Sequence, residues 1–398
     1  MSKGFGPGAL EACPAPHARV GFSGGDGEFR RIVIRGTLLE LVTFGFYRFW
    51  LATNIRRHLW TNTSVEEDAL EYTGTGRELL IGFLFALTIL IPIYLASFAI
   101  SIEAERWKAF AGLPFGVAYY GFWQFAIYRA RRYRLTRTLW RGVRFWMTGS
   151  GWAYMARALG WTLLTVLTLG IAYPWREAAL ERYKLGHTFY GDLPGRFEGD
   201  GWVFFKRGWR LWLLLLGLFG FILVYVLALR NYVALSIFAV PIAVGSFFLL
   251  CFIYPAFKAV EWKWWAEGLR FGDASRDVRF ASNLRPGALA TNFWNMIGVC
   301  ILVVIVAIFT MIGINIVFAV LQPWLLLPAR YAVITCYLAT VVVLGVVWRI
   351  YMGQRVWKIV VSSISLENLA AVDHVVAKSK AASAIGEGLA DSLDVAGF

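Results

Sequence analysis

Charged residues are scarce in this chain, and recognisable catalytic or metal-binding motifs are absent. Only 16% of the 398 residues are charged, whereas soluble domains carry about 25%. The four cysteines and four histidines are scattered, without a CxxC pair or metal-ligand spacing. The sequence contains no Ser–His–Asp, HExxH, Walker or kinase-like motif. We therefore expect no enzymatic activity, no bound metal and no cofactor.

Apolar residues, by contrast, make up 59% of the chain. Six apolar stretches approach or exceed the roughly 18–20 residues that span hydrocarbon, and two further stretches, at 32–51 and 156–175, resemble them but are each interrupted by a glycine. The six are 79–100, 110–128, 211–229, 232–257, 293–318 and 331–348. So many stretches in one chain indicate a polytopic membrane protein. The first 20 residues are polar, so we expect no cleaved signal peptide.

The distribution of Lys and Arg favours one topology. If all eight stretches cross, the two sides of the membrane carry 25 and 13 basic residues. If 32–51 and 156–175 do not cross, the two sides carry 34 and 4 basic residues. The positive-inside rule favours the second arrangement. We therefore expect about six transmembrane helices in three hairpins, two re-entrant or interfacial helices, and cytoplasmic termini. Eight transmembrane helices are the alternative.

One polar pattern occurs three times between the apolar stretches. Its Arg, Thr, Gly and Gly positions recur at offsets of 75 and then 50: Arg57, Thr63, Gly74, Gly76; Arg132, Thr138, Gly149, Gly151; Arg182, Thr188, Gly199, Gly201. The segment between Thr and Gly alternates in character and predicts a β-hairpin. The Gly-x-Gly then predicts a tight joint between strand and helix. We expect the hairpins to form one cytoplasmic β-layer beneath the helices.

These patterns divide the chain into a polar tail (1–20), a repeated membrane domain (21–352) and a cytoplasmic C-terminal segment (353–398). The repeat copies span about 43–76, 118–151 and 168–201, with a degenerate copy at 258–291. A last hairpin is expected from Arg355–Ser365 and Leu369–Lys378.

Three ionisable residues within the stretch 32–51 form a candidate intramembrane polar site: Arg35, Glu40 and Arg48. Charged groups are costly in lipid and often mark function there. An internal ion pair that fixes a bent helix is the other reading. The turn after Glu40 has a counterpart at an offset of 125, where Thr43-Phe44-Gly45 matches Thr168-Leu169-Gly170.

Several motifs together resemble the YjgN family of bacterial inner-membrane proteins. They are Gly45-Phe46-Tyr47-Arg48-Phe49-Trp50, Arg56-Arg57, Tyr72-Thr73-Gly74-Thr75-Gly76-Arg77-Glu78-Leu79 and Gly386-Glu387-Gly388-Leu389-Ala390-Asp391. The resemblance extends from about Gly21 to the C-terminus. It implies a bacterial inner-membrane location and supplies no catalytic residues.

Two functions fit these features. The repeats, broken segments and ionisable residues favour a transporter or channel for a small or amphipathic molecule. The alternative is a non-enzymatic membrane scaffold or lipid-interacting protein. The net charge of +14 is typical of contact with anionic membrane lipids rather than nucleic acid. The sequence names no protein partner.

Overall fold

The structure, a computed structural model, describes residues 18–103, 108–229, 233–273, 276–321 and 326–378. Most of the expected N-terminal tail and the motif at Gly386–Asp391 lie outside these residues. So do parts of the turns expected near 101–109, 230–231 and 319–330.

Pairs of helices alternate along the chain with pairs of strands. The helix pairs are α1 (Asp26–Val42) with α2 (Arg48–Thr61), α3 (Gly76–Glu103) with α4 (Lys108–Thr136), α5 (Gly151–Leu167) with α6 (Tyr173–Gly186), α7 (Gly201–Leu229) with α8 (Ala239–Gly268), and α9 (Pro286–Leu321) with α10 (Leu326–Trp348). A 3₁₀ turn, η1 (Val233–Phe238), precedes α8. A π-helix, η3 (Arg349–Arg355), and α11 (Val356–Val361) follow α10.

Ten short strands close into an antiparallel barrel. The strands are β1 (Ala18–Phe22), β2 (Thr63–Val65), β3 (Asp68–Tyr72), β4 (Thr138–Trp140), β5 (Val143–Met147), β6 (Thr188–Tyr190), β7 (Leu193–Phe197), β8 (Leu269–Gly272), β9 (Asp277–Ser282) and β10 (Ile364–Glu367). Each strand pairs with its neighbours in sequence, and β1 pairs with both β2 and β10. The register places Ala18 opposite Leu366, so the two ends of the described chain complete the barrel.

The barrel interior is filled by apolar side chains. One buried cluster combines residues from seven strands, which only the inside of a closed barrel can bring together: Ala18, Val65, Trp140, Tyr190, Leu193, Val278 and Leu366. Leu369 and Val372 of the 3₁₀ turn η4 (Leu369–Val372) join this cluster. A transmembrane strand needs about 9–11 residues, so strands of three to six residues are too short to cross a membrane.

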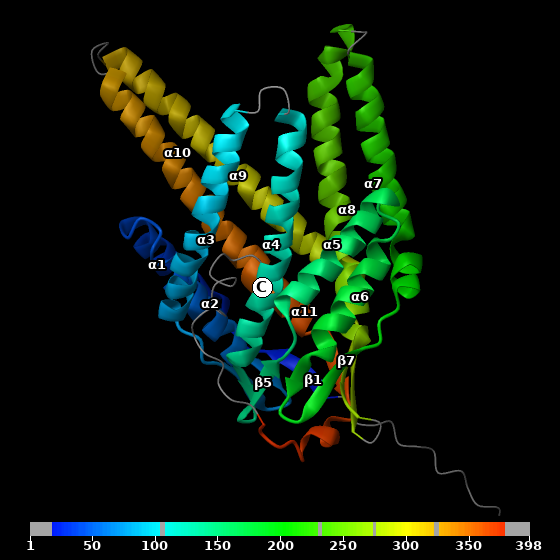
Figure 1. Ribbon diagram of the computed structural model, residues 1–398. Helices are drawn as coiled ribbons and strands as arrows, with labels where there is room; N and C mark the ends of the chain where they lie inside the picture. The colour runs from blue at the N-terminus through cyan, green and yellow to red at the C-terminus, as the bar shows by residue number, and fades with distance from the viewer. Residues whose placement is uncertain (1–17, 104–107, 230–232, 274–275, 322–325, 379–398) are drawn as a thin grey trace, which may run out of the picture.

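The long helices all extend from one side of the barrel (Figure 1). Among the described residues, five helices are long and apolar enough to cross a membrane: Gly76–Ala99, Gly201–Ala228, Ser236–Gly268, Pro286–Val320 and Arg330–Val361. Their side chains are largely exposed, as expected for helices that contact lipid rather than a protein core. α4 pairs with α3 but is not among the five.

The expected fold class is therefore wrong. The sequence analysis predicts a helical membrane protein with about six spans and a β-layer, or alternatively eight spans, whereas the structure has a closed ten-stranded barrel and five candidate spans. Closure depends on pairing β1 with β10, which are about 345 residues apart and leave no local signal. The expected last hairpin is also wrong, because residues 355–361 are helical and only β10 follows.

The three sets of matched positions occupy equivalent places in the fold. Thr63, Thr138 and Thr188 each begin a strand, and each hydroxyl donates to the carbonyl four residues earlier, at 2.7–2.8 Å. The second glycine of each set begins a helix: Gly76, Gly151 and Gly201. A Cβ at Gly76 would lie 2.9 Å from the Cα of Trp50, so the start of α3 packs directly on α2.

Candidate functional site

The two short helix pairs, α1–α2 and α5–α6, share one tight turn. Phe44 and Leu169 both adopt a φ of 50°, and the glycines that follow both adopt a φ of 88°. The hydroxyl of the preceding threonine donates to a carbonyl four residues earlier, at 2.7 Å for Thr43 and 2.8 Å for Thr168. The positive φ of the glycine explains its presence. The stretches expected at 32–51 and 156–175 are thus each two helices joined by this turn.

Both turns expose apolar side chains. The exposed fraction is 94% for Phe44 and 72% for Leu169, and the exposed neighbours are Leu38, Leu39, Leu41, Val42, Phe46, Leu163, Leu164, Val166, Leu167 and Ile171. We call these two groups the apolar tips. Contiguous exposed apolar surface of this kind marks a contact with a membrane or another protein.

The depth of one tip is fixed by its packing against α7. A Cβ on Gly170 would lie 3.0 Å from Nε1 of Trp212. Trp212 directly follows the basic residues Lys206, Arg207 and Arg210, where the apolar part of α7 starts. Tryptophan and basic residues together are typical of the membrane–water interface. This tip therefore lies level with Trp212, close to where the apolar part of α7 starts.

A groove of about 480 Å³ opens between α1 and α2. Its polar end lies toward the barrel and its apolar end lies beside the tip. The lining residues are Glu28, Ile32, Arg35, Gly36, Leu39, Tyr47, Asn54, Arg57, His58, Thr61 and Asn62.

Basic side chains in the groove have no counter-charge of their own. The side chains of Arg35 and Arg57 are exposed and form no hydrogen bond or ion pair with the described part of the chain. The His58 side chain is 4% exposed, and Nδ1 lies 3.3 Å from the Asn62 amide nitrogen and 3.8 Å from Glu28. Its Nε2 is buried and has no partner among the described residues. Burial lowers the pKa of His58, against the raising effect of Glu28.

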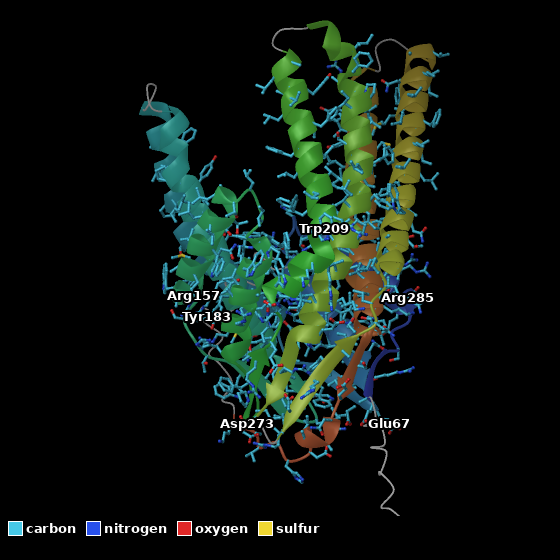
Figure 2. All side chains as sticks on the ribbon, turned by 90° about the vertical axis from the view of Figure 1, so that its right-hand side faces the viewer. Glu67, Arg157, Tyr183, Trp209, Asp273 and Arg285 are labelled. Atoms are coloured by element: carbon cyan, nitrogen blue, oxygen red, sulfur yellow. The ribbon has the colours of Figure 1, made fainter. Side chains whose placement is uncertain are left out.

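The corresponding side chains of α5 and α6 stack on one another. At the offset of 125, the counterparts of Ile32, His58 and Asn62 are Arg157, Tyr183 and His187. The Arg157 guanidinium lies over the Tyr183 ring at 4.2 Å, and the ring centroids of Tyr183 and His187 are 4.4 Å apart. Figure 2 shows Arg157 beside Tyr183, between the barrel turns at Glu67 and Asp273 and the level of Trp209. The open groove is a feature of α1–α2.

The structure does not bring Arg35, Glu40 and Arg48 together as a single site. Glu40 accepts a hydrogen bond at 2.8 Å from Arg349, which also donates to Thr37 at 2.8 Å. The Arg48 guanidinium lies 4.8 Å from the centroid of the Phe83 ring. Only Arg35 lines the groove.

A second polar group surrounds α6. Glu181 pairs with Lys184 and, at 3.1 Å, with Arg131 of α4. Burial opposes ionisation of Glu181, but Lys184 and Arg131 overcome it and hold the pKa of the carboxyl well below its usual range. One turn earlier Glu177 pairs with Arg176, yet burial raises the pKa of this carboxyl. Arg176 also donates to Tyr120 at 3.0 Å and to Thr162 at 3.1 Å.

The sequence analysis missed both the groove and the α6 network. The three matched sets describe joints of the fold rather than these polar sites. A signal for the groove is present in the sequence, since aligning 26–62 with 151–187 shows Ile32, His58 and Asn62 where the second pair has larger or aromatic residues. Among the described residues, no group of three or more His, Cys, Asp or Glu side chains could hold a metal ion.

Comparison with known proteins places this architecture in a family. No curated protein and no solved structure matches the chain. A family model described as a bacterial protein of unknown function (DUF898) matches residues 17–392. The chain therefore belongs to this bacterial family, the YjgN family suggested by its motifs.

Proposed function

We propose that this protein is a non-enzymatic, lipid-interacting protein of the bacterial inner membrane, with both termini in the cytoplasm. The single observation that carries the proposal is the pair of apolar tips, of which the one on α5–α6 packs against Trp212 of α7, next to basic residues. An amphipathic helix pair in this position inserts its apolar end at the headgroup boundary while its base stays in water.

The charge distribution supports the same orientation. The barrel and the helix ends next to it contain most of the basic residues, as counted in the sequence. Such an excess is typical of the cytoplasmic face, where anionic lipids attract Lys and Arg.

Lipid analysis tests this proposal. The protein is extracted in mild detergent, and the phospholipids that purify with it are compared by mass spectrometry with those of the source membrane. We expect anionic phospholipids to be enriched. A composition equal to that of the source membrane would contradict the proposal. Neutralising Arg131 would not test this proposal, because Arg131 pairs with the buried Glu181 and its loss would also affect stability.

Transport of a small or amphipathic molecule is the second candidate. The observation that favours it is the α6 network, in which two glutamates one turn apart have pKa values displaced in opposite directions. Groups of this kind often serve function. The test is a thermal-shift screen of the purified protein against metabolites and lipids. A stabilising soluble metabolite supports transport, whereas stabilisation by lipids alone supports the first proposal.

A further inference from the structure

We propose that the α1–α2 groove is a specific site for the phosphate headgroup of an anionic phospholipid. The inference rests on the proposed lipid interaction and assigns it to one place in the fold. The phosphate lies between Arg35 and Arg57, and the acyl chains leave along the apolar tip.

The first argument is charge complementarity. Arg35 and Arg57 line the same groove without internal partners, while Arg349 and Arg131 elsewhere are held by carboxylates. Guanidinium groups bind phosphate through paired, charge-assisted hydrogen bonds. Glu28 at the rim offsets part of this charge, but it faces His58.

The second argument is the set of hydrogen-bonding side chains at the polar end. Asn54, Thr61 and Asn62 line the groove there together with His58. These neutral groups can add hydrogen bonds to a headgroup that the two arginines bind.

The third argument is the shape of the ligand. The groove changes from polar residues near the barrel to Leu39 and Tyr47 near the tip. Leu39 continues into the exposed residues Leu41, Val42 and Phe44. A free phosphate needs no apolar end, whereas a phospholipid at the interface presents its headgroup and chains in this order. The site therefore fits the lipid better than the free anion.

The α5–α6 pair provides an internal comparison. It has the same turn and an apolar tip. The stacked side chains of Arg157, Tyr183 and His187 occupy its groove position. Specific headgroup binding is thus expected at α1–α2 alone.

Direct titration tests this site. The full-length protein in a neutral detergent is titrated with dihexanoyl phosphatidylglycerol, dihexanoyl phosphatidylcholine and inorganic phosphate. We expect the anionic lipid to bind more tightly than either of the others. Arg35→Gln and Arg57→Gln should each weaken it at least about tenfold, because a charge-assisted hydrogen bond contributes about 1.5–3 kcal/mol. The matched control is Arg30→Gln with Arg31→Gln, which removes two charges from exposed positions of α1 outside the groove.

Each outcome decides a different claim. Equal weakening by the control variant, or no effect of Arg35→Gln and Arg57→Gln, overturns the site. Binding of inorganic phosphate as tightly as the lipid overturns the lipid as its ligand. If the Arg35→Gln/Arg57→Gln protein still co-purifies with enriched anionic lipid, the general lipid interaction stands and only the site fails. If the unaltered protein shows no enrichment, the proposed function itself fails.

Discussion

The guanidinium of Arg157 lies over the ring of Tyr183, 4.2 Å from its centroid, where the equivalent space between α1 and α2 is open. Two helix pairs with one turn geometry therefore differ in the side chains between their helices. In α5–α6 these side chains stack on one another, whereas in α1–α2 Arg35 and Arg57 line an open groove.

Filling the groove should abolish headgroup binding without unfolding the protein. His58→Tyr introduces the residue found at the equivalent position of α5–α6. We expect loss of phosphatidylglycerol binding in the titration described above, because the larger ring occupies the polar end. The thermal unfolding midpoint should stay close to that of the parent protein. Unchanged binding by a folded His58→Tyr variant would show that the groove is not the site.

The buried ion pair of α6 should be important for stability. Glu181→Gln leaves Lys184 and Arg131 without their counter-charge, and breaking a buried pair costs about 3–5 kcal/mol. Glu198→Gln is the control, since Glu198 pairs with Arg270 but its side chain is 56% exposed; it should cost at most about 1 kcal/mol. Thermal unfolding in detergent measures both variants. Equal losses would argue against a special role for the α6 network.

Closure of the barrel can be tested by a disulfide. Arg19 and Ser365 are paired across β1 and β10, and paired residues in antiparallel strands are about 4.5–5.5 Å apart at Cα, within the range of a disulfide. Arg19→Cys with Ser365→Cys should crosslink under mild oxidation in a background lacking the native cysteines. Arg19→Cys with Arg144→Cys should not crosslink, because Arg144 lies on β5, which pairs with β4 and β6 and not with β1. An open β-layer would leave the first pair uncrosslinked.

The joint between β3 and α3 should not tolerate a side chain. In Gly76→Ala the new Cβ would lie 2.9 Å from the Trp50 Cα, and we expect a loss of about 1–3 kcal/mol from overpacking. Gly217→Ala is the control, because no atom lies within 4 Å of a Cβ there, and its effect should stay below about 1 kcal/mol. The thermal unfolding midpoints of the two variants are compared. Equal midpoints would show that the contact between Gly76 and Trp50 is not tight enough to exclude a side chain.

Acidification should destabilise the protein partly through His58. Because burial lowers its pKa in the folded state, its contribution is fully present above the unfolded pKa of about 6.5. It is lost as the pH falls below that value, since the unfolded chain takes up the proton first. The unfolding midpoint should therefore fall less between pH 7 and pH 5 in His58→Gln than in the parent. An identical pH dependence of the two would contradict this assignment.

Local features of the fold follow from local sequence, whereas closure and the ion pairs do not. Alternating residues with turn signals predict the hairpins β2–β3, β4–β5 and β6–β7, which the structure confirms. The β1–β10 pairing and the Glu40–Arg349 ion pair join residues hundreds of positions apart, so no local pattern can encode them. The sequence therefore groups Glu40 with Arg35 and Arg48, whereas its partner in the structure is Arg349.

The groove can be predicted from the sequence only in part. Arg35 and Arg57 are visible in the sequence, but their shared groove depends on the angle at which α1 returns into α2. The offset of 125 relates Ile32 and His58 to Arg157 and Tyr183, and only the structure shows that the second pair stacks.

Photocrosslinking from equivalent tip positions tests the central claim most directly. Leu39 borders the groove and Leu164 is its counterpart at the offset of 125, and both side chains are 43% exposed. Benzoylphenylalanine is placed at each position in native membranes, with Glu67 on a barrel turn as the aqueous control, and the adducts are identified by mass spectrometry. The account predicts mainly anionic phospholipid at Leu39, bulk membrane composition at Leu164, and no lipid at Glu67. The same lipid composition at Leu39 and Leu164, or no lipid at Leu39, would contradict it.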